Sequence, residues 1–165
     1  MKLLVCSDSH RTLTYMRRAV LAEQPDLFIH LGDHEDDAQQ LSRKFPTLPL
    51  LQVCGNCDAG WSDEQRTAAL GGAVFFLTHG HRYGVKYSLL RAELAAREAG
   101  ANVLLFGHTH IPLCDWHNGL WIVNPGACSG RTPTYAAIEA DDGILRPAIR
   151  SMDDLERIEK GTQSL

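Results

Sequence analysis

The chain has 165 residues, enough for one domain that buries roughly 70% of its unfolded surface in a single core. Its 16 Lys and Arg against 20 Asp and Glu give a formal net charge of −4, which argues against stable binding of DNA or RNA, because such binding needs a basic face. A small phosphorylated substrate is still compatible with this charge, since bound metals can supply positive charge locally.

The sequence predicts a cytoplasmic protein that does not cross a membrane. No apolar stretch reaches the roughly 20 residues that a bilayer requires. The apolar N-terminal run is too short for a signal peptide and leads directly into Asp8 and His10, so we predict it to be a strand. Five scattered cysteines follow no disulfide spacing, which is typical of reduced thiols: Cys6, Cys54, Cys57, Cys114 and Cys128.

The first third of the chain alternates expected strands with expected helices. Apolar runs at 2–6, 27–30 and 48–53 predict strands, and the segments 12–23 and 35–44 between them predict helices. This alternation is typical of βαβ units, so we expect a sheet with parallel pairs.

The middle of the chain continues with an expected strand at 74–78, a helix from about 86 to 99 and a strand at 102–106. Gly100, just beyond the helix, suits a C-cap. The apolar face of this helix is expected to comprise Leu89, Leu90, Leu94 and Ala95.

Beyond residue 110 the pattern changes to short strands joined by turn signals, of which Asn118-Gly119 and Asp142-Gly143 favour tight antiparallel hairpins. The expected strands are 112–117, 120–123, 134–139 and 144–150. We therefore expect mixed sheets in two layers with helices outside. We expect a single domain over 1–165, in which 152–165 is a solvated helix or tail.

Side chains that bind metals follow five of the expected strands: Asp8 and His10, Asp33, Asn56, His79 and His81, and His108 and His110. Oxygen and nitrogen donors of these types hold divalent ions such as Mn²⁺, Fe²⁺ or Zn²⁺. One such motif is weak evidence, because a lone Asp-x-His is more often a surface pair and a single histidine is more often structural. Their coincidence at strand ends predicts metal-dependent hydrolysis. His30, inside a strand, and His34, on the opposite face from Asp33, are weaker candidates.

The spacing of two pairs fits this interpretation. Asp8 and His10 are two residues apart, as are His108 and His110, and in an extended segment such residues point to the same side. Extended histidines would have Cα atoms about 6–7 Å apart, which suits two metals roughly 3.5–4 Å apart. The Asp33 carboxylate is suited to bridge two cations.

The order Asp-x-His, Gly-Asp, Gly-Asn-x-Asp, His-Gly-His and Gly-His-Thr-His resembles the calcineurin-like metallophosphoesterases. The chain is most similar, from residue 1 to about 149, to the compact bacterial and archaeal phosphodiesterase branch, for which Gly55-Asn56-Cys57-Asp58 and Asn124-Pro125-Gly126 are typical. The resemblance implies an α/β fold, namely a four-layer αββα sandwich with mixed β-sheets and a dimetal site at the carboxyl ends of the strands.

The resemblance also implies two divalent metal ions per chain, Mn²⁺ first and Fe, Ni, Co or Zn as alternatives. Asp8, His10 and His110 would hold one metal, Asn56, His79 and His108 the other, and Asp33 would bridge them. The cations would convert a bridging water to hydroxide, which attacks a small phosphoester, while Asn56 stabilises the phosphoryl oxygens. Compact relatives are often oligomers, so a homo-oligomer is an option.

One departure concerns the proton donor. Many superfamily members carry histidine after the asparagine, where it protonates the leaving oxygen, and here that residue is Cys57. A thiol with a pKa of about 8.5 is a poor donor. Protonation of the leaving oxygen is then weak, or is carried out by His81 or a metal-bound water. We therefore expect the substrate to be a phosphodiester with a good leaving group. Alternatively, His81 only shapes its loop. Asp58 is expected to anchor a loop.

Two other functions are considered. Cys54 and Cys57 fit C-x-x-C, but no second cysteine pair completes a zinc site, and the surrounding sequence predicts a loop rather than the helix start of a redox motif. The second is a non-enzymatic metal-binding scaffold or interaction protein, as in a retromer subunit of similar fold with a degraded metal site. The presence of all seven expected ligands favours the enzyme.

Overall fold

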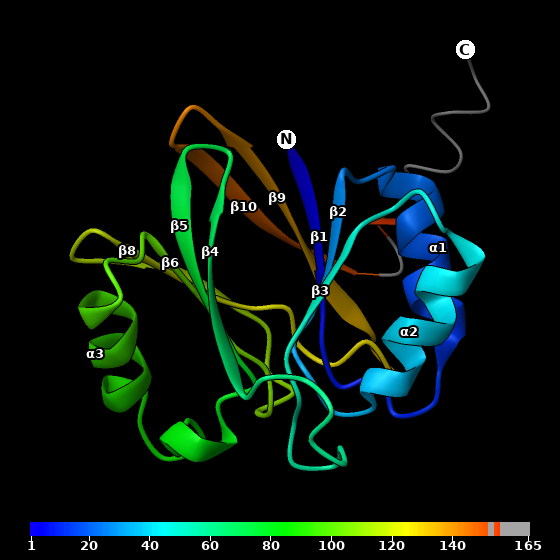
Figure 1. The fold of residues 1–165 in the computed structure, drawn as a ribbon, viewed down its shortest axis with the longest axis horizontal. Coiled ribbons are helices and arrows are strands. Elements are labelled where there is room, and N and C mark those ends of the chain that lie inside the picture. Colours follow the sequence, from blue (N-terminus) through cyan, green and yellow to red (C-terminus); the bar gives the residue numbers. More distant parts are fainter. Residues whose placement is uncertain (152–153, 156–165) are drawn as a thin grey trace.

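Two β-sheets lie face to face between layers of helices in the computed structural model, which describes residues 1–151 and 154–155 (Figure 1). Helices α1 (Leu13–Glu23) and α2 (Glu35–Lys44) cover the outer face of one sheet, and α3 (Leu90–Glu98) covers the outer face of the other. The four-layer αββα sandwich with mixed sheets is thus confirmed. Among the described residues, no helix is long and apolar enough to span a membrane.

The first sheet has the order β10-β9-β1-β2-β3. Its strands are β1 (Lys2–Cys6), β2 (Leu27–His30), β3 (Leu50–Gln52), β9 (Thr134–Asp141) and β10 (Ile144–Ser151). Strand β2 is parallel to both β1 and β3, as the alternation with helices predicts. Strand β9 returns antiparallel to β1 and forms a hairpin with β10.

The second sheet has the order β4-β5-β6-β8-β7. Its strands are β4 (Gln65–Leu70), β5 (Ala73–Thr78), β6 (Val103–Leu105), β7 (Leu113–His117) and β8 (Leu120–Asn124). Strands β5, β6 and β8 are parallel, with antiparallel β4 and β7 at the edges. Strand β4 has no counterpart in the sequence-based expectations. An edge strand with mostly exposed side chains carries little of the apolar pattern by which strands are recognised.

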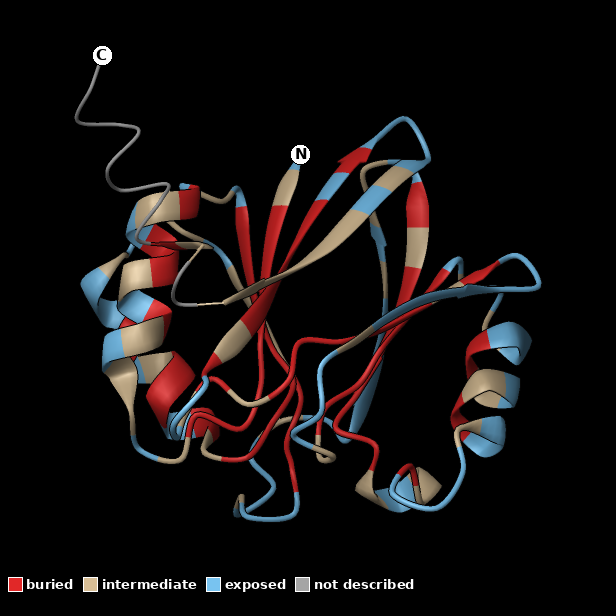
Figure 2. Cartoon of the chain, turned by 180° about the vertical axis from the view of Figure 1, so that it is seen from behind, coloured by how far each residue is buried: buried red, intermediate tan, exposed pale blue. Residues whose placement is uncertain are grey.

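The alternation of side chains along the strands creates the layers. In β1, Leu3 and Val5 enter the core between the two sheets, whereas Leu4 and Cys6 pack toward α1 and α2. A third apolar cluster fills the space between the second sheet and α3. Buried residues accordingly occupy the strands and the inner faces of the helices (Figure 2).

Two sequence-based expectations are wrong in detail. Helix α3 begins at Leu90 rather than 86, because residues 84–87 form a separate turn, in which Gly84 has a left-handed φ of 66° and its carbonyl accepts the Tyr87 N–H. Of the expected apolar face, Leu89 and Ala95 are partly buried against the third cluster, whereas Leu90 and Leu94 are 61% and 51% exposed, and the fully buried residues of the helix are Ala92 and Ala96. The expected C-cap glycine is confirmed, since Gly100 has a φ of 68° directly after the helix.

The expected solvated tail is wrong at one residue. Leu155 is fully buried in the cluster that contains Met16 and Val20 of α1. Asp154 accepts hydrogen bonds from the backbone N–H and the hydroxyl of Ser151, which turns the chain toward that cluster. Residues 152–153 and 156–165 lie outside the described part of the chain.

Candidate metal centre

The seven expected ligands come from loops at the carboxyl ends of parallel strands in both sheets. Three of them, Asp8, Asp33 and Asn56, follow β1, β2 and β3 of the first sheet, and His10 extends the first of these loops. The others, His79, His108 and His110, follow β5 and β6 of the second sheet. Because the sheets face each other, these loops converge at one edge of the sandwich (Figure 1).

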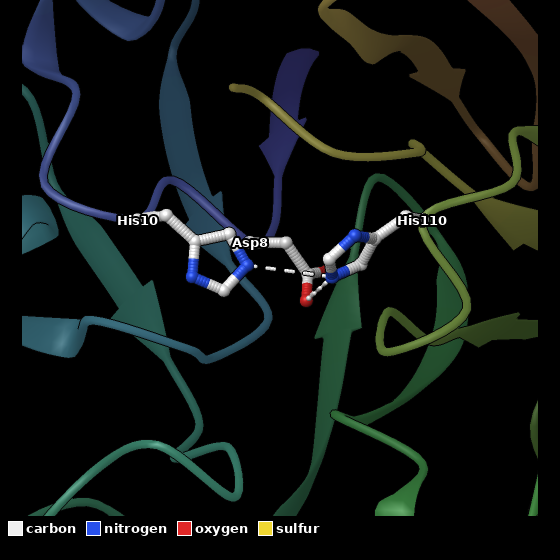
Figure 3. A group of neighbouring side chains, drawn as sticks. All are labelled: Asp8, His10 and His110. Atoms are coloured by element: carbon white, nitrogen blue, oxygen red, sulfur yellow. Dashed lines mark hydrogen bonds and ion pairs between the residues drawn. The ribbon is translucent and has the colours of Figure 1, made fainter. Parts of the chain in front are cut away.

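The first group of donors is Asp8, His10 and His110 (Figure 3). The Nε2 atom of His110 lies 3.0 Å from Oδ1 of Asp8 and 3.4 Å from Nε2 of His10. Despite that proximity, the buried Oδ1 of Asp8 accepts no hydrogen bond from any described residue. Two imidazole nitrogens and a carboxylate oxygen therefore meet at one point, an arrangement that a shared cation would satisfy.

The second group is arranged around His79. Its Nδ1 lies 2.8 Å from the carbonyl oxygen of Leu31, which can only accept, so this nitrogen carries the hydrogen of the neutral ring. The lone pair of Nε2 then faces Oδ1 of Asn56 at 3.1 Å and Oδ1 of Asp33 at 3.4 Å. Such a backbone contact fixes the tautomer of many metal-binding histidines. The Leu31 carbonyl thus prepares His79 to bind a cation.

His108 completes this side of the centre. Its ring centroid lies 5.0 Å from that of His79, and its backbone N–H donates to Oδ2 of Asp8. Burial lowers the pKa of His108 to about 4, with further contributions from His79 and Lys86. Burial acts to raise the pKa of Asp33, but His79 and the N–H of Cys57 outweigh it and lower that pKa. At neutral pH the imidazole keeps its lone pair and the carboxylate its charge.

These donors fit divalent metal ions. Unpaired carboxylate, amide and imidazole acceptors that face one another repel unless a cation lies between them, and this mixture of donors suits ions such as Mn²⁺, Fe²⁺ and Zn²⁺. The structure adds one point to the sequence analysis, because Asp8 belongs to both groups: its carboxylate also lies within 4.8 Å of donor atoms of Asp33 and His79.

The route by which the ligands converge differs from the expected one. The spacing argument assumed extended backbone at Asp8-x-His10 and His108-x-His110, and this is wrong, because all four residues have left-handed φ angles. Of the ten non-glycine residues with positive φ in the described part of the chain, seven lie in these loops: Asp8, His10, Arg11, Asp33, His34, His108 and His110. Left-handed backbone turns each loop sharply, so its side chains can point back into the site.

Two glycines let the loops after β2 and β3 touch. A Cβ atom on Gly32 would lie 2.5 Å from the backbone nitrogen of Gly55, and one on Gly55 would lie 2.2 Å from Oδ1 of Asp33. Neither distance is tolerable for a side chain, and the φ of Gly32 is +93° in addition. The Gly-Asp and Gly-Asn motifs are therefore required by the close approach of Asp33 and Asn56.

Asp58 anchors this pair of loops, as expected. Its carboxylate accepts four backbone hydrogen bonds, at 2.7–2.9 Å, from the N–H groups of Gly55, Asp33, His34 and Glu35. Two of these donors lie at the start of α2, where backbone N–H groups have no partner within the helix. One carboxylate therefore caps a helix and fixes the positions of two expected ligands.

Two further residues, Asp37 and Asn124, position the loops of the site, and the sequence alone did not indicate this role for them. The buried Asp37 of α2 accepts 2.7 Å hydrogen bonds from the Ser9 hydroxyl and the Arg11 backbone, which hold the loop after β1. Its signal was an acidic residue on the apolar face of a helix. The buried Asn124 donates to the Gly107 carbonyl and the Thr109 hydroxyl, which hold the loop of His108 and His110.

The remaining candidates lie around the centre. His81 is in a short 3-10 helix (His81–Tyr83), with its ring centroid 5.4 Å from that of His79, and burial together with His79 lowers its pKa. His34 stacks edge-on against His10 at 5.3 Å, so it borders the site. Cys57 is exposed in a loop, as predicted. Burial, then Asp33, raises the pKa of its thiol, which agrees with neither a redox nor a zinc-binding cysteine.

Comparison with known proteins agrees with this geometry. Residues 1–143 match the family described as the calcineurin-like phosphoesterase superfamily domain. The chain belongs to this superfamily. The family is metal-dependent, and the donor groups around Asp8 are of the kind that binds metal.

Relatives and solved structures resemble the chain over nearly its whole length. It is 32% identical to a probable metallophosphoesterase, YsnB, of Bacillus subtilis, over 96% of the chain and 97% of the relative. It is 26% identical to the phosphodiesterase MJ0936 of Methanocaldococcus jannaschii, over 90% of the chain and 99% of the relative. The crystal structure of a predicted phosphoesterase from Streptococcus pneumoniae has a TM-score of 0.76 at 26% identity. The similarity covers 92% of this chain and 90% of that protein. Vps29 of Entamoeba histolytica shares the fold, at a TM-score of 0.72 and 19% identity, over 92% of this chain and 99% of that protein.

Proposed function

We propose that this superfamily member is a phosphodiesterase that hydrolyses a small phosphate diester with two divalent metal ions. The observation that carries the proposal is the convergence of metal-binding donor atoms, namely the carboxylates of Asp8 and Asp33, the amide oxygen of Asn56 and Nε2 of His79, among which Oδ1 of Asp8 accepts no hydrogen bond from any described residue. A protein that only binds partners has no need to hold such mutually repelling groups in buried, strained loops.

The proposed ligands are those that the sequence indicated. Asp8, His10 and His110 would hold one metal, Asn56, His79 and His108 the second, and Asp33, with Asp8 beside it, would lie between them. When bound there, two divalent cations lower the pKa of water and offset negative charge on the phosphoryl oxygens. Mn²⁺ is the ion proposed for the first assay.

The residues of the chain then orient the substrate. The amide of Asn56 is neutral, so it adds a ligand without repelling a phosphate, and its Nδ2 faces the open side near Cys57 Sγ, 3.3 Å away. Asp58 accepts the N–H of Gly55 before Asn56 and Asp33 accepts the N–H of Cys57 after it, so the backbone on both sides of this amide is held in place. His81, behind His79, is proposed as a hydrogen-bond donor to the ester.

A diester is favoured over a monoester by charge and by Cys57. A diester has one negative charge, which suits a centre already bordered by several carboxylates. The Cys57 thiol stands where an imidazolium would protonate the leaving oxygen, and a thiol with a raised pKa is a poor acid. We therefore propose a substrate whose leaving group departs as the anion of an alcohol or phenol of low pKa.

The first experiment measures hydrolysis of 4-nitrophenyl methyl phosphate by metal-stripped protein, with and without added Mn²⁺. We expect activity only with metal, and Asp33→Asn should lower kcat/KM by at least about 100-fold, because one ligand of the centre is lost. The control is Asp63→Asn, which removes an exposed carboxylate, 70% accessible, outside the centre. If two metals bind per chain without turnover, the enzyme proposal fails and the scaffold alternative replaces it.

A further inference from the structure

An apolar pocket of about 500 Å³ lies beside the metal centre, on the side of the second sheet. Among the residues that line it are Lys86, Leu89, Phe106, Thr109, Ile111 and Leu113. Its size falls within the range of roughly 300–1,000 Å³ typical of small-molecule sites, which are mostly apolar with a few polar groups. Lys86 is its one charged lining residue in the described part of the chain.

The pocket adjoins the proposed catalytic site at one residue. Thr109, one of its lining residues, stands between the expected ligands His108 and His110. The hydroxyl of Thr109 accepts hydrogen bonds from Nδ2 of Asn124 and from the backbone of Ile111, at 3.0 and 3.2 Å. The hydrogen bonds that hold the loop of His108 and His110 therefore also fix this wall of the pocket. A ligand does not have to order the wall when it binds.

A second pocket, of about 450 Å³, borders the centre on the side of the first sheet and has a different character. Its lining includes Arg11, His34, Asp36, Cys57 and Trp61. The polar pocket adjoins the centre at Cys57, whose N–H donates to Oδ1 of Asp33, and the apolar pocket adjoins it at Thr109. A phosphodiester carries two substituents, which must leave the phosphorus on different sides, so each pocket is placed to receive one of them.

We propose that the apolar pocket binds an aromatic or aliphatic substituent of the substrate, and that Ile111 sets this preference. The inference rests on the proposed phosphodiesterase function and adds a substrate class to it, namely asymmetric diesters with one apolar group. The positive charge of Lys86 at the pocket complements the phosphodiester anion. Ile111, which is 68% exposed, would be covered by the substituent.

The test compares the binding of phenylphosphonate and methylphosphonate to the Mn²⁺-loaded protein by isothermal titration calorimetry. Burial of the phenyl ring should make phenylphosphonate bind about tenfold more tightly, because roughly 60 Å² of apolar surface leaves water. In Ile111→Ser this ratio should fall to about threefold or less. Circular dichroism and thermal unfolding of the variant verify that it is folded.

Two variants serve as controls. Leu90→Ser changes a leucine of similar exposure that does not line the pocket, so it should keep the tenfold ratio. Trp61→Ala changes the aromatic residue of the polar pocket and should also keep it. A ratio near one in the natural protein, a ratio that Ile111→Ser leaves unchanged, or a loss of the ratio in Trp61→Ala would each overturn the inference.

Hydrolysis of 4-nitrophenyl methyl phosphate, measured in parallel, distinguishes the two possible failures. If this ester is hydrolysed with Mn²⁺ but the phosphonates show no preference, only the apolar subsite is wrong. If it is not hydrolysed, the proposed function fails, and the inference fails with it.

Discussion

The backbone conformation of the site residues is the feature that sequence spacing could not provide. Asp8, His10, His108 and His110 all lie in the left-handed region, where a non-glycine residue costs on the order of 1 kcal/mol or more. Aspartate, asparagine and histidine tolerate this region better than other residues. The residue types that bind metals are thus also types that can adopt the required turns, and the surrounding hydrogen bonds to Asp58, Asp37 and Asn124 hold them there.

Replacing the residue after Asn56 tests the proposed cause of substrate choice. In Cys57→His an imidazole would stand beside the leaving oxygen, so esters with poor leaving groups, such as phenyl methyl phosphate, should be hydrolysed at least about tenfold faster. The 4-nitrophenyl ester, which needs little protonation, should change much less. Cys57→Ser is the matched control. Unchanged rates for both esters in Cys57→His would refute the argument.

The buried imidazole of His30 is expected to make the folded protein less stable in acid. Its Nδ1 accepts the Gly32 N–H, and its buried Nε2 finds no partner among the described residues. Burial lowers its pKa from 6.5 to about 4; the charges of Asp8, Asp58 and Asp37 act in the opposite direction, and His79 adds to the lowering. Between these pH values the unfolded chain binds a proton that the folded chain does not, so stability falls as the pH falls.

The size of this loss can be measured. At roughly 1.4 kcal/mol for each pH unit between the two pKa values, it should reach about 3 kcal/mol at pH 4. Urea unfolding measures this for the natural protein and for His30→Asn, which keeps an acceptor for Gly32. Between pH 6.5 and 4 the free energy of unfolding should decrease less in the variant than in the natural protein. Parallel pH curves for the two proteins would contradict the assignment.

At the scale of elements, α3 shows why the apolar pattern selected the wrong face. Leucines at 90 and 94 outweigh alanines in any hydrophobicity count, yet the fully buried residues of the helix are Ala92 and Ala96, with Leu89 and Ala95 partly buried beside them. Small residues let it lie close to the second sheet, against Phe76 and Leu104. Leu90 and Leu94 are left at the surface, and the pattern alone gives no information on how close the sheet approaches.

The close approach of α3 can be tested by a pair of substitutions. Ala96→Leu inserts three carbon atoms into a fully packed contact and should lower the free energy of unfolding by about 1–3 kcal/mol. Leu94→Lys changes a half-exposed side chain and should stay within about 0.5 kcal/mol of the natural protein. Chemical denaturation measures both. A larger effect of Leu94→Lys would support the leucine face that the sequence indicated.

At the scale of the whole molecule, the candidate metal centre draws its expected ligands from both sheets. Asp8 and Asp33 follow strands of the first sheet, whereas His79, His108 and His110 follow strands of the second. Metals bound between them would cross-link the two halves of the sandwich at the edge where repelling donors meet. Their removal should therefore weaken the protein as a whole as well as abolish its activity.

Chelation provides the corresponding measurement. A metal present at about 100 times its Kd stabilises the folded state by roughly 2.7 kcal/mol, so stripping it should lower Tm by about 5–10 °C in a chain of this length. Asp33→Asn should lose most of this dependence, while Asp63→Asn should retain it. An identical Tm with and without Mn²⁺ in the natural protein would contradict metal binding by the folded state.

Much of this protein is determined by its sequence. The apolar pattern predicted mixed sheets with helices outside, and the donors at strand ends predicted a metal site, because residue type and apolar period are local properties. The four-layer arrangement and the assignment of ligands to each metal came from the family resemblance. The parallel order of β1, β2 and β3 followed from the alternation with helices. The Gly55-Asn56-Cys57-Asp58 loop was also predicted correctly, since glycine and asparagine are strong turn residues.

Only the tertiary structure decided the rest. Strand β4, the alanine face of α3, the burial of Leu155 and the presence of Asp8 in both donor groups depend on which surfaces meet. The same holds for the polar and apolar pockets on either side of the centre, which are built from loops of different sheets. Sequence patterns record what each residue prefers locally, whereas these features arise from contacts between segments that lie far apart along the chain.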